Sequence, residues 1–339
     1  MLNILYIFII SLYLGCTQIH TLNLVDQNYN NSPREIVWLQ VAGLDEEHLA
    51  MLRFSYDNSK KVTSFETMPC IGKMWNYNFF EIRPKARNSF ITQITGAKNI
   101  KNTCDDYEKK PFWKFFGLSD FHVGVIEVGS RKNESFEEAW SCGTKGKNFT
   151  EDMTLWRMYK SESTPTNKQF HYQENIPGEK QIYYDKSCEN DTCYSTLFEN
   201  TKSIYKRFKQ SKDRILIIRN FSFRNYLKAG NILRAKDELS EIDKIINYFI
   251  QMQRLKKDLM VILTTAENIP IELPRKGREW IKFQKSGKNI LFRNPSLMSS
   301  VFVSGPGAQN YCGFFEESEL SKRILWEPDV QKIKFNLFN

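Results

Sequence analysis

The feature that most constrains the fold is a series of apolar runs, each separated from the next by a longer polar or amphipathic stretch. The apolar runs occupy residues 36–41, 121–129, 214–220, 258–268 and 296–308. Between them, apolar residues recur at helical spacing, most clearly over residues 88–99 and 235–257. Strands that alternate with helices predict an α/β fold, here a three-layer sandwich around a largely parallel central sheet.

The first apolar run ends in a loop that has the position of a functional site but not its chemistry. In open α/β sheets, ligands bind beside the carboxyl ends of the strands. Ala42 and Gly43 follow this run, and the methyl group of Ala42 can neither bind a metal nor attack a substrate. The acidic residues 45–47 that follow are expected to begin a helix, where negative charge complements the helix dipole.

From residue 35 onward, the order of such landmarks resembles the alkaline phosphatase superfamily, which includes sulfatases, nucleotide pyrophosphatases and phosphopentomutases. Its members open with a strand ending in Asp-Gly, where the Asp binds metal, and Ala42 takes that place here. They carry a Ser, Thr or Cys nucleophile ten positions before the Gly of a Thr-Gly pair. In this chain the pair is Thr95 with Gly96, and the residue ten positions before Gly96 is Ala86.

The later landmarks of the superfamily also differ. Its middle strand ends in Asp, with a His a few residues on, and the segment here offers Asn220, then Arg224 or Tyr226. Its late segment, similar to Thr-Ser-Asp-His-Gly, corresponds to a stretch in which Ala266 and Glu267 take the ligand positions. The resemblance therefore assigns five vestigial positions to this chain: Ala42, Ala86, Asn220, Ala266 and Glu267.

The chemistry of the superfamily explains why these differences matter. Its reaction needs one or two divalent metals that activate the nucleophile and neutralise charge on the transferred group. An alanine at the nucleophile position removes the covalent step, and an amide binds a hard divalent ion more weakly than a carboxylate. No histidine follows His171, whereas the His ligands of the superfamily lie on later segments. The resemblance implies a pseudoenzyme without a cofactor, although its ancestral family uses a divalent metal such as zinc or calcium.

Two other functions remain open at this point. One is an active phosphoric or sulfuric ester hydrolase or transferase with a rearranged site, for which the candidates are Glu267, Asp45 and Ser89. Their ordinary roles would be a solvent-facing loop carboxylate, a helix-start acid and a helix cap. The other is a structural envelope protein whose cleft is filled by side chains. An open polar or aromatic cleft would instead indicate a binding protein.

The N-terminal residues predict export. A short apolar run ends at Gly15, before Cys16, which resembles a bacterial lipoprotein cleavage site, so Cys16 is expected to carry lipid after residues 1–16 have acted as the signal. Residues 17–34 are polar and predict a flexible tether. Residues 35–339 are expected to form one domain, with a polar insertion that contains cysteines around 132–202. The expected location is the bacterial periplasm or outer membrane, or otherwise the secreted fraction.

The cysteine content and the net charge limit the cellular environments and the binding partners that are compatible with this chain. Six cysteines remain besides Cys16, an even number that predicts disulfides in an oxidising compartment. Cys188 and Cys193 could close a small loop, and the other pairings stay open. The net charge of +9 is spread along the chain, so no nucleic acid is expected. The expected partners are a protein or an anionic envelope ligand, together with the membrane through the lipid on Cys16.

Overall fold

The computed structural model describes residues 33–56, 62–115, 122–190, 192–207, 213–288 and 290–324. The expected export signal, Cys16 and nearly all of the expected tether lie outside the described residues. Within the described part of the chain, no helix is both long enough and apolar enough to cross a bilayer.

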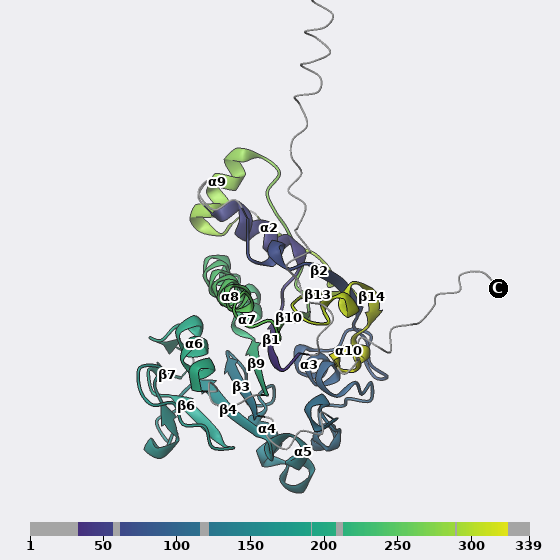
Figure 1. Ribbon diagram of the computed structural model, residues 1–339. Helices are drawn as coiled ribbons and strands as arrows, with labels where there is room; N and C mark the ends of the chain where they lie inside the picture. Colours follow the sequence, from purple (N-terminus) through teal and green to yellow (C-terminus); the bar gives the residue numbers. More distant parts are fainter. Residues whose placement is uncertain are drawn as a thin grey trace, which may run out of the picture.

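A ten-stranded sheet forms the centre of the molecule, and seven of its nine neighbouring strand pairs are parallel. This confirms the predicted α/β fold with a largely parallel sheet (Figure 1). The strands, in their order across the sheet, are β14 (Gly313–Glu316), β2 (Cys70–Trp75), β13 (Met298–Ser304), β10 (Leu259–Ala266), β1 (Glu35–Ala42), β9 (Arg214–Asn220), β3 (His122–Val128), β4 (Met153–Met158), β6 (Ile182–Asp185) and β5 (Gln169–Phe170).

Helices cover both faces of the sheet and create two apolar cores. One core includes side chains from α2 (Glu46–Ser55), α6 (Leu197–Arg207), α7 (Ser222–Lys228), α8 (Ile232–Gln253) and α9 (Gly277–Ser286). The other includes side chains from α3 (Ala86–Thr95), α4 (Glu137–Ser141), α5 (Lys147–Thr150) and α10 (Leu320–Ile324). The strands β1, β9 and β10 between these layers are buried along their whole length, which explains their continuous apolar sequences.

The segment 132–202 is part of the main sheet and is not an insertion beside it. It contributes β4, β6 and β5, and β4 pairs in parallel with β3 and is buried along its whole length. The polar character of the segment comes from the loops and short helices between these strands, so a composition average hides them. This corrects the expected position of the insertion and places the loops after β3 and β4 at the carboxyl edge of the sheet.

All six cysteines of the described residues form disulfides. Cys188 and Cys193 join β7 (Cys188–Glu189) to β8 (Thr192–Cys193), which confirms the small loop predicted between them. The two other bonds are Cys70–Cys312, which links β2 to the segment before β14, and Cys104–Cys142. Three disulfides indicate a protein that folds in an oxidising compartment.

Candidate functional site

A small apolar cluster occupies the carboxyl edge of the sheet at the positions that the resemblance assigns to metal and nucleophile. Ala42 and Ala266 are paired at the ends of β1 and β10, and Ala86 is the first residue of α3. With Phe90 and Phe221 they form a separate buried cluster, and each of the five is fully excluded from solvent. The structure thus brings together three of the five positions that the resemblance assigns and packs them with two aromatic rings.

Asn220, the fourth of these positions, uses its side chain to bind the first turn of α7 and a carboxyl group of α8. Its Oδ1 accepts a hydrogen bond from the backbone N–H of Phe223 at 3.1 Å, in the first turn of α7. Its Nδ2 donates to Oε1 of Glu238 on α8 at 2.5 Å. Both ends of this amide are therefore bound within the protein, and Phe221 is the next residue, which packs against the alanines.

Glu267, the fifth position, is held by the protein and does not face open solvent as expected. It follows β10 with a φ of 50°, in the left-handed region that few residues other than glycine adopt. Its carboxylate accepts from the backbone N–H of Ala86 at 3.0 Å and from Arg224 Nη1 at 2.9 Å, and it forms an ion pair with Lys228. A protein carboxylate thus occupies the N-terminus of α3, where helix dipoles favour an anion.

Arg224 connects Glu267 to a second carboxylate. Its Nη1 and Nη2 bind the two oxygens of Glu134 at 2.6 and 2.9 Å, which is the bidentate geometry that makes such pairs strong. Burial acts to raise the pKa of Glu267 and of Glu134, but Arg224 outweighs it, together with Lys228 at Glu267, and the pKa of each carboxyl is lowered. Two anions and two cations therefore form a closed network.

Gly43 allows this network to lie against the end of β1. Its φ is 87°, and a Cβ at this position would lie 2.9 Å from Cα of Arg224. Gly43 thus lets α7 approach β1 closely enough for Arg224 to reach both carboxylates.

The other candidates for a rearranged active site lie in separate surroundings. Asp45 caps α2, where its side chain accepts from Glu46 N–H and its backbone N–H donates to Nδ1 of His48, as the acidic helix start predicted. Ser89 is fully buried in α3. Among the described residues, one cluster brings together three side chains of the kinds that bind metals: Asp185, Cys188 and Cys193. The two cysteine sulfurs of this cluster are bonded to each other in a disulfide.

A buried polar network lies beneath the alanine cluster and ends at an unusual carboxyl group. Gln93 on α3 accepts from Thr264 Oγ1 at 2.7 Å and from Gln40 Nε2 at 3.1 Å, and it donates to Oε1 of Glu317 at 2.8 Å. Within the part of the chain that the structure describes, Glu317 forms no ion pair with a Lys or Arg, and burial raises its pKa to about 7. The folded protein therefore keeps a proton on Glu317 under mildly acidic conditions.

This proton makes stability depend on pH in a defined direction. The unfolded chain releases this proton near the ordinary pKa of 4.5, whereas the folded protein retains it up to a pH of about 7. We therefore expect Glu317 alone to lower the free energy of unfolding by about 3 kcal/mol as the pH rises from about 4.5 to 7. Glu317→Gln should reduce the slope measured by urea denaturation across this range without abolishing it, because burial also raises the pKa of Glu238 to about 7. Glu316→Gln is the control, since the pKa of Glu316 is lowered by Lys98 and the slope should persist. An unchanged slope in Glu317→Gln would contradict the assignment.

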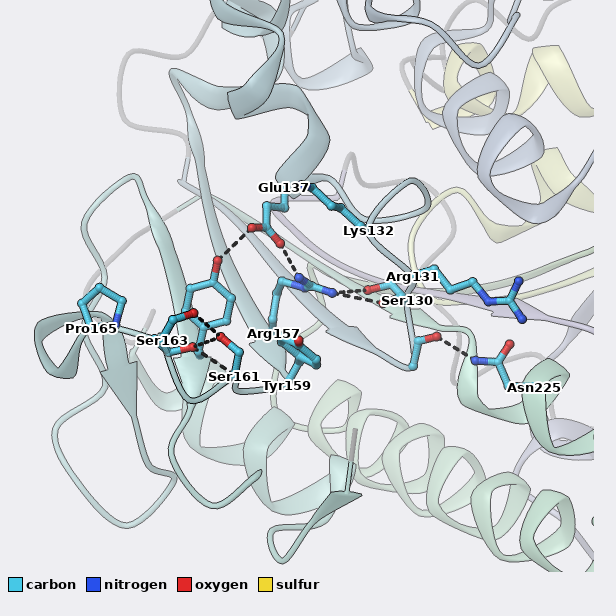
Figure 2. Close-up of a pocket in the computed structure, with 13 residues that line it drawn as sticks. Ser130, Arg131, Lys132, Glu137, Arg157, Tyr159, Ser161, Ser163, Pro165 and Asn225 are labelled. Carbon is cyan, nitrogen blue, oxygen red and sulfur yellow. Dashed lines mark hydrogen bonds and ion pairs between the residues drawn. The ribbon is translucent and has the colours of Figure 1, made fainter. Parts of the chain in front are cut away.

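A second hollow lies on the same edge of the sheet, beyond the ends of β3, β4 and β6 (Figure 2). This cavity has a volume of about 620 Å³. Arg157, at the end of β4, is buried in its wall; its Nη2 donates to the backbone oxygen of Ser130 at 3.0 Å, and its Nη1 pairs with Glu137. Arg131 lines both this cavity and a smaller one, of about 170 Å³, beside Arg224 and Glu267.

Sequence reasoning missed Glu134, Lys228 and the whole cavity. One signal was available: Arg224 and Lys228 are four residues apart, so on a helix they share a face and can act on the same anion. Glu134 and the cavity lie in or beside the segment that composition assigned to an insertion, so nothing local indicated that they border the site.

Comparisons with known proteins identify the fold. No protein-family model matches the sequence, and no curated protein matches it either. Among solved structures, alkaline phosphatase from the Antarctic bacterium TAB5 superposes with a TM-score of 0.63 at 15% identity, covering 87% of this chain and 98% of that one. Thermus thermophilus alkaline phosphatase gives 0.65 at 9% identity, covering 91% and 94%, and a cold-active alkaline phosphatase from Shewanella sp. gives 0.62 at 11%, covering 87% and 100%. The chain has the fold of the alkaline phosphatases.

Proposed function

We propose that this protein is an exported, non-catalytic member of the alkaline phosphatase fold that binds a ligand at the carboxyl edge of its sheet. The observation that carries the proposal is the packing of Ala42, Ala86 and Ala266 with two phenylalanines at the positions of metal and nucleophile. Three methyl groups offer no ligand to a divalent ion and no nucleophile to a phosphoryl or sulfuryl group. The resident metal of the superfamily does not fit these residues.

The ion-pair network supports the same proposal. An active site of this class leaves room for the anionic group that it transfers, and cations there must be free to bind it. Here Glu267 takes the N-terminus of α3, and Arg224 and Lys228 are bound to it. An incoming anion would have to displace a carboxylate that is held by three groups. We infer that ligands bind beside this network.

The location completes the proposal. The three disulfides fit an oxidising compartment, and the N-terminal sequence ending at Cys16 resembles a lipoprotein signal. We propose that lipid on Cys16 holds the protein at the cell envelope, where it acts as a binding component. Its ligand would be an anionic envelope component, a class that the basic charge of the chain favours.

Metal content and turnover test the proposal together. Protein purified without chelators should contain less than stoichiometric zinc, calcium, magnesium and manganese by mass spectrometry. The same sample should hydrolyse para-nitrophenyl phosphate and para-nitrophenyl sulfate no faster than an unrelated protein, because the alanine cluster offers neither a nucleophile nor metal ligands.

A variant identifies the site if turnover is found. Stoichiometric metal with turnover would overturn the proposal, and loss of that turnover in Glu267→Gln, but not in the surface variant Glu174→Gln, would assign it to a rearranged site. TAB5 alkaline phosphatase serves as the positive control for phosphate ester hydrolysis.

A further inference from the structure

We propose that the cavity at the ends of β3, β4 and β6 binds an anionic sugar, that is, a saccharide that carries a phosphate or carboxylate group. The inference rests on the proposed function in one respect, that the ligand is held and not hydrolysed. The cavity lies where parallel strands of α/β proteins present ligand sites, and its lining has two chemically different sides.

The first side is cationic. Three cations and one carboxylate line the cavity: Arg131, Lys132, Arg157 and Glu137. Glu137 is already bound, because it pairs with Arg157 and accepts from the hydroxyl of Tyr184 at 3.0 Å. Arg131 and Lys132 are exposed, and their side chains have no hydrogen-bond or ion-pair partner within the described residues. They are therefore available to an anion, and guanidinium matches the geometry of phosphate and carboxylate.

These two cations stand on an anchored loop. The buried carboxylate of Glu127 accepts from the backbone N–H of Phe136 at 2.9 Å and from the hydroxyl of Ser130 at 3.2 Å. Glu134 is held by both terminal nitrogens of Arg224. Asn225 Nδ2 donates to the backbone oxygen of Gly129 at 2.8 Å. Because the backbone of the loop is held in place before binding, little backbone entropy is lost when the cations meet a ligand.

The second side is rich in hydroxyl groups. Ser161 Oγ lies 3.1 Å from Ser163 Oγ and 3.1 Å from Thr164 Oγ1. Figure 2 shows these serines on the opposite side of Arg157 from Arg131 and Asn225. Hydroxyls both donate and accept, as sugar hydroxyls do, and the rings of Tyr159 and Tyr184 add apolar surface to the lining. An elongated ligand could thus meet cations at one end and hydroxyls at the other.

The size of the cavity supports a sugar over a free inorganic anion. Its volume of about 620 Å³ lies within the range typical of small-molecule sites, roughly 300–1,000 Å³. A phosphate ion would contact the cations alone and leave the hydroxyl side unfilled. A monosaccharide with one anionic group matches both sides.

Isothermal titration calorimetry on the full chain, at constant ionic strength, tests the proposal. The probes are glucose 6-phosphate, glucuronate, glucose and inorganic phosphate. We expect at least one of the two anionic sugars to bind at least about tenfold more tightly than glucose and inorganic phosphate, because only an anionic sugar contacts both sides. Which of the two binds more tightly distinguishes phosphate from carboxylate as the anionic group. The proposal is overturned if neither anionic sugar binds, or if neither binds more tightly than glucose and inorganic phosphate.

Matched variants locate the binding. R131A/K132A should weaken the anionic sugar about tenfold or more, since each charge-assisted contact contributes substantially. R278A/K282A removes the same charges from exposed positions on α9, away from the cavity (Figure 1), and should leave binding unchanged. S161A/S163A should weaken the sugars but not inorganic phosphate. Equal losses in the two charge variants would overturn the site. Hydrolysis of glucose 6-phosphate would instead refute the proposed non-catalytic function and leave the binding site standing.

Discussion

Glu127→Gln is expected to lower the free energy of unfolding by about 3–5 kcal/mol, the cost of leaving a buried charge without its partner. Glu127 and Arg219 form an ion pair in which both side chains are fully inaccessible to solvent. The guanidinium lies 3.7 Å from the centroid of the Phe136 ring and is surrounded by apolar groups of the alanine cluster. Because water cannot reach Arg219, no solvent replaces the lost carboxylate. Equilibrium denaturation in urea measures the effect.

A double-mutant cycle separates the ion pair from the other contacts of Glu127. Arg219→Met removes the cation, and the double variant R219M/E127Q leaves no charge at either position. We expect the double variant to be more stable than the sum of the single losses predicts, because the buried charges disappear together. Glu174→Gln is the control, since its pair with Lys186 is exposed and should change stability by less than about 1 kcal/mol. Additive losses would show that the pair is not coupled.

The central strands could be predicted from the sequence because each is buried on both faces. Such strands need apolar residues at nearly every position, and the runs at 36–41 and 214–220 show this directly. By contrast, β2 alternates buried and exposed residues over only six positions, and β4 contains Thr154 and Arg157 although it is buried. The polar atoms of β4 find partners far away in the sequence, as Arg157 does in Glu137. That pairing exists only once the sheet has formed.

The candidate site divides in the same way. Ala42, Ala86 and Ala266 could be placed by their distance from recognisable landmarks, because each stands at the end of a predictable strand or the start of a predictable helix. The role of Glu267 could not, since its partners Ala86 and Arg224 are separated from it by 181 and 43 residues. A carboxylate after a strand is equally compatible with solvent, metal or an ion pair. Only the relative positions of α3 and α7 decide between them.

The cavity was missed because of one wrong inference about composition. Its lining comes from loops after β3 and β4 and from β6, and most of these residues lie within 132–202. A segment assigned to a peripheral insertion gives no reason to look for a site at the carboxyl edge of the main sheet. Once β4 and β6 are placed beside β3, the loops that follow them must meet there, as in other parallel sheets.

Removing the Cys70–Cys312 bond should have the largest effect on stability of the three disulfides. It closes a loop with a sequence separation of 242, compared with 38 for Cys104–Cys142 and 5 for Cys188–Cys193. A crosslink lowers the entropy of the unfolded chain more when its loop is longer, which gives about 5 kcal/mol for the first bond and about 2 kcal/mol for the shortest. C70A/C312A should therefore unfold at a much lower urea concentration than C188A/C193A.

The two variants form a matched pair because each replaces the two cysteines of one disulfide at or beside a pair of short strands, and the loop lengths differ greatly. Cys70 begins β2, and Cys312 directly precedes β14, which pairs with β2 at one edge of the sheet. Loss of the bond should also free residues beyond 312 to detach from β2, since an edge pair this short is held by few hydrogen bonds. Hydrogen exchange should then show faster amide exchange in β14 and α10 of C70A/C312A than in C188A/C193A. Equal stability losses in the two variants would mean that local contacts, and not loop closure, determine what each disulfide contributes.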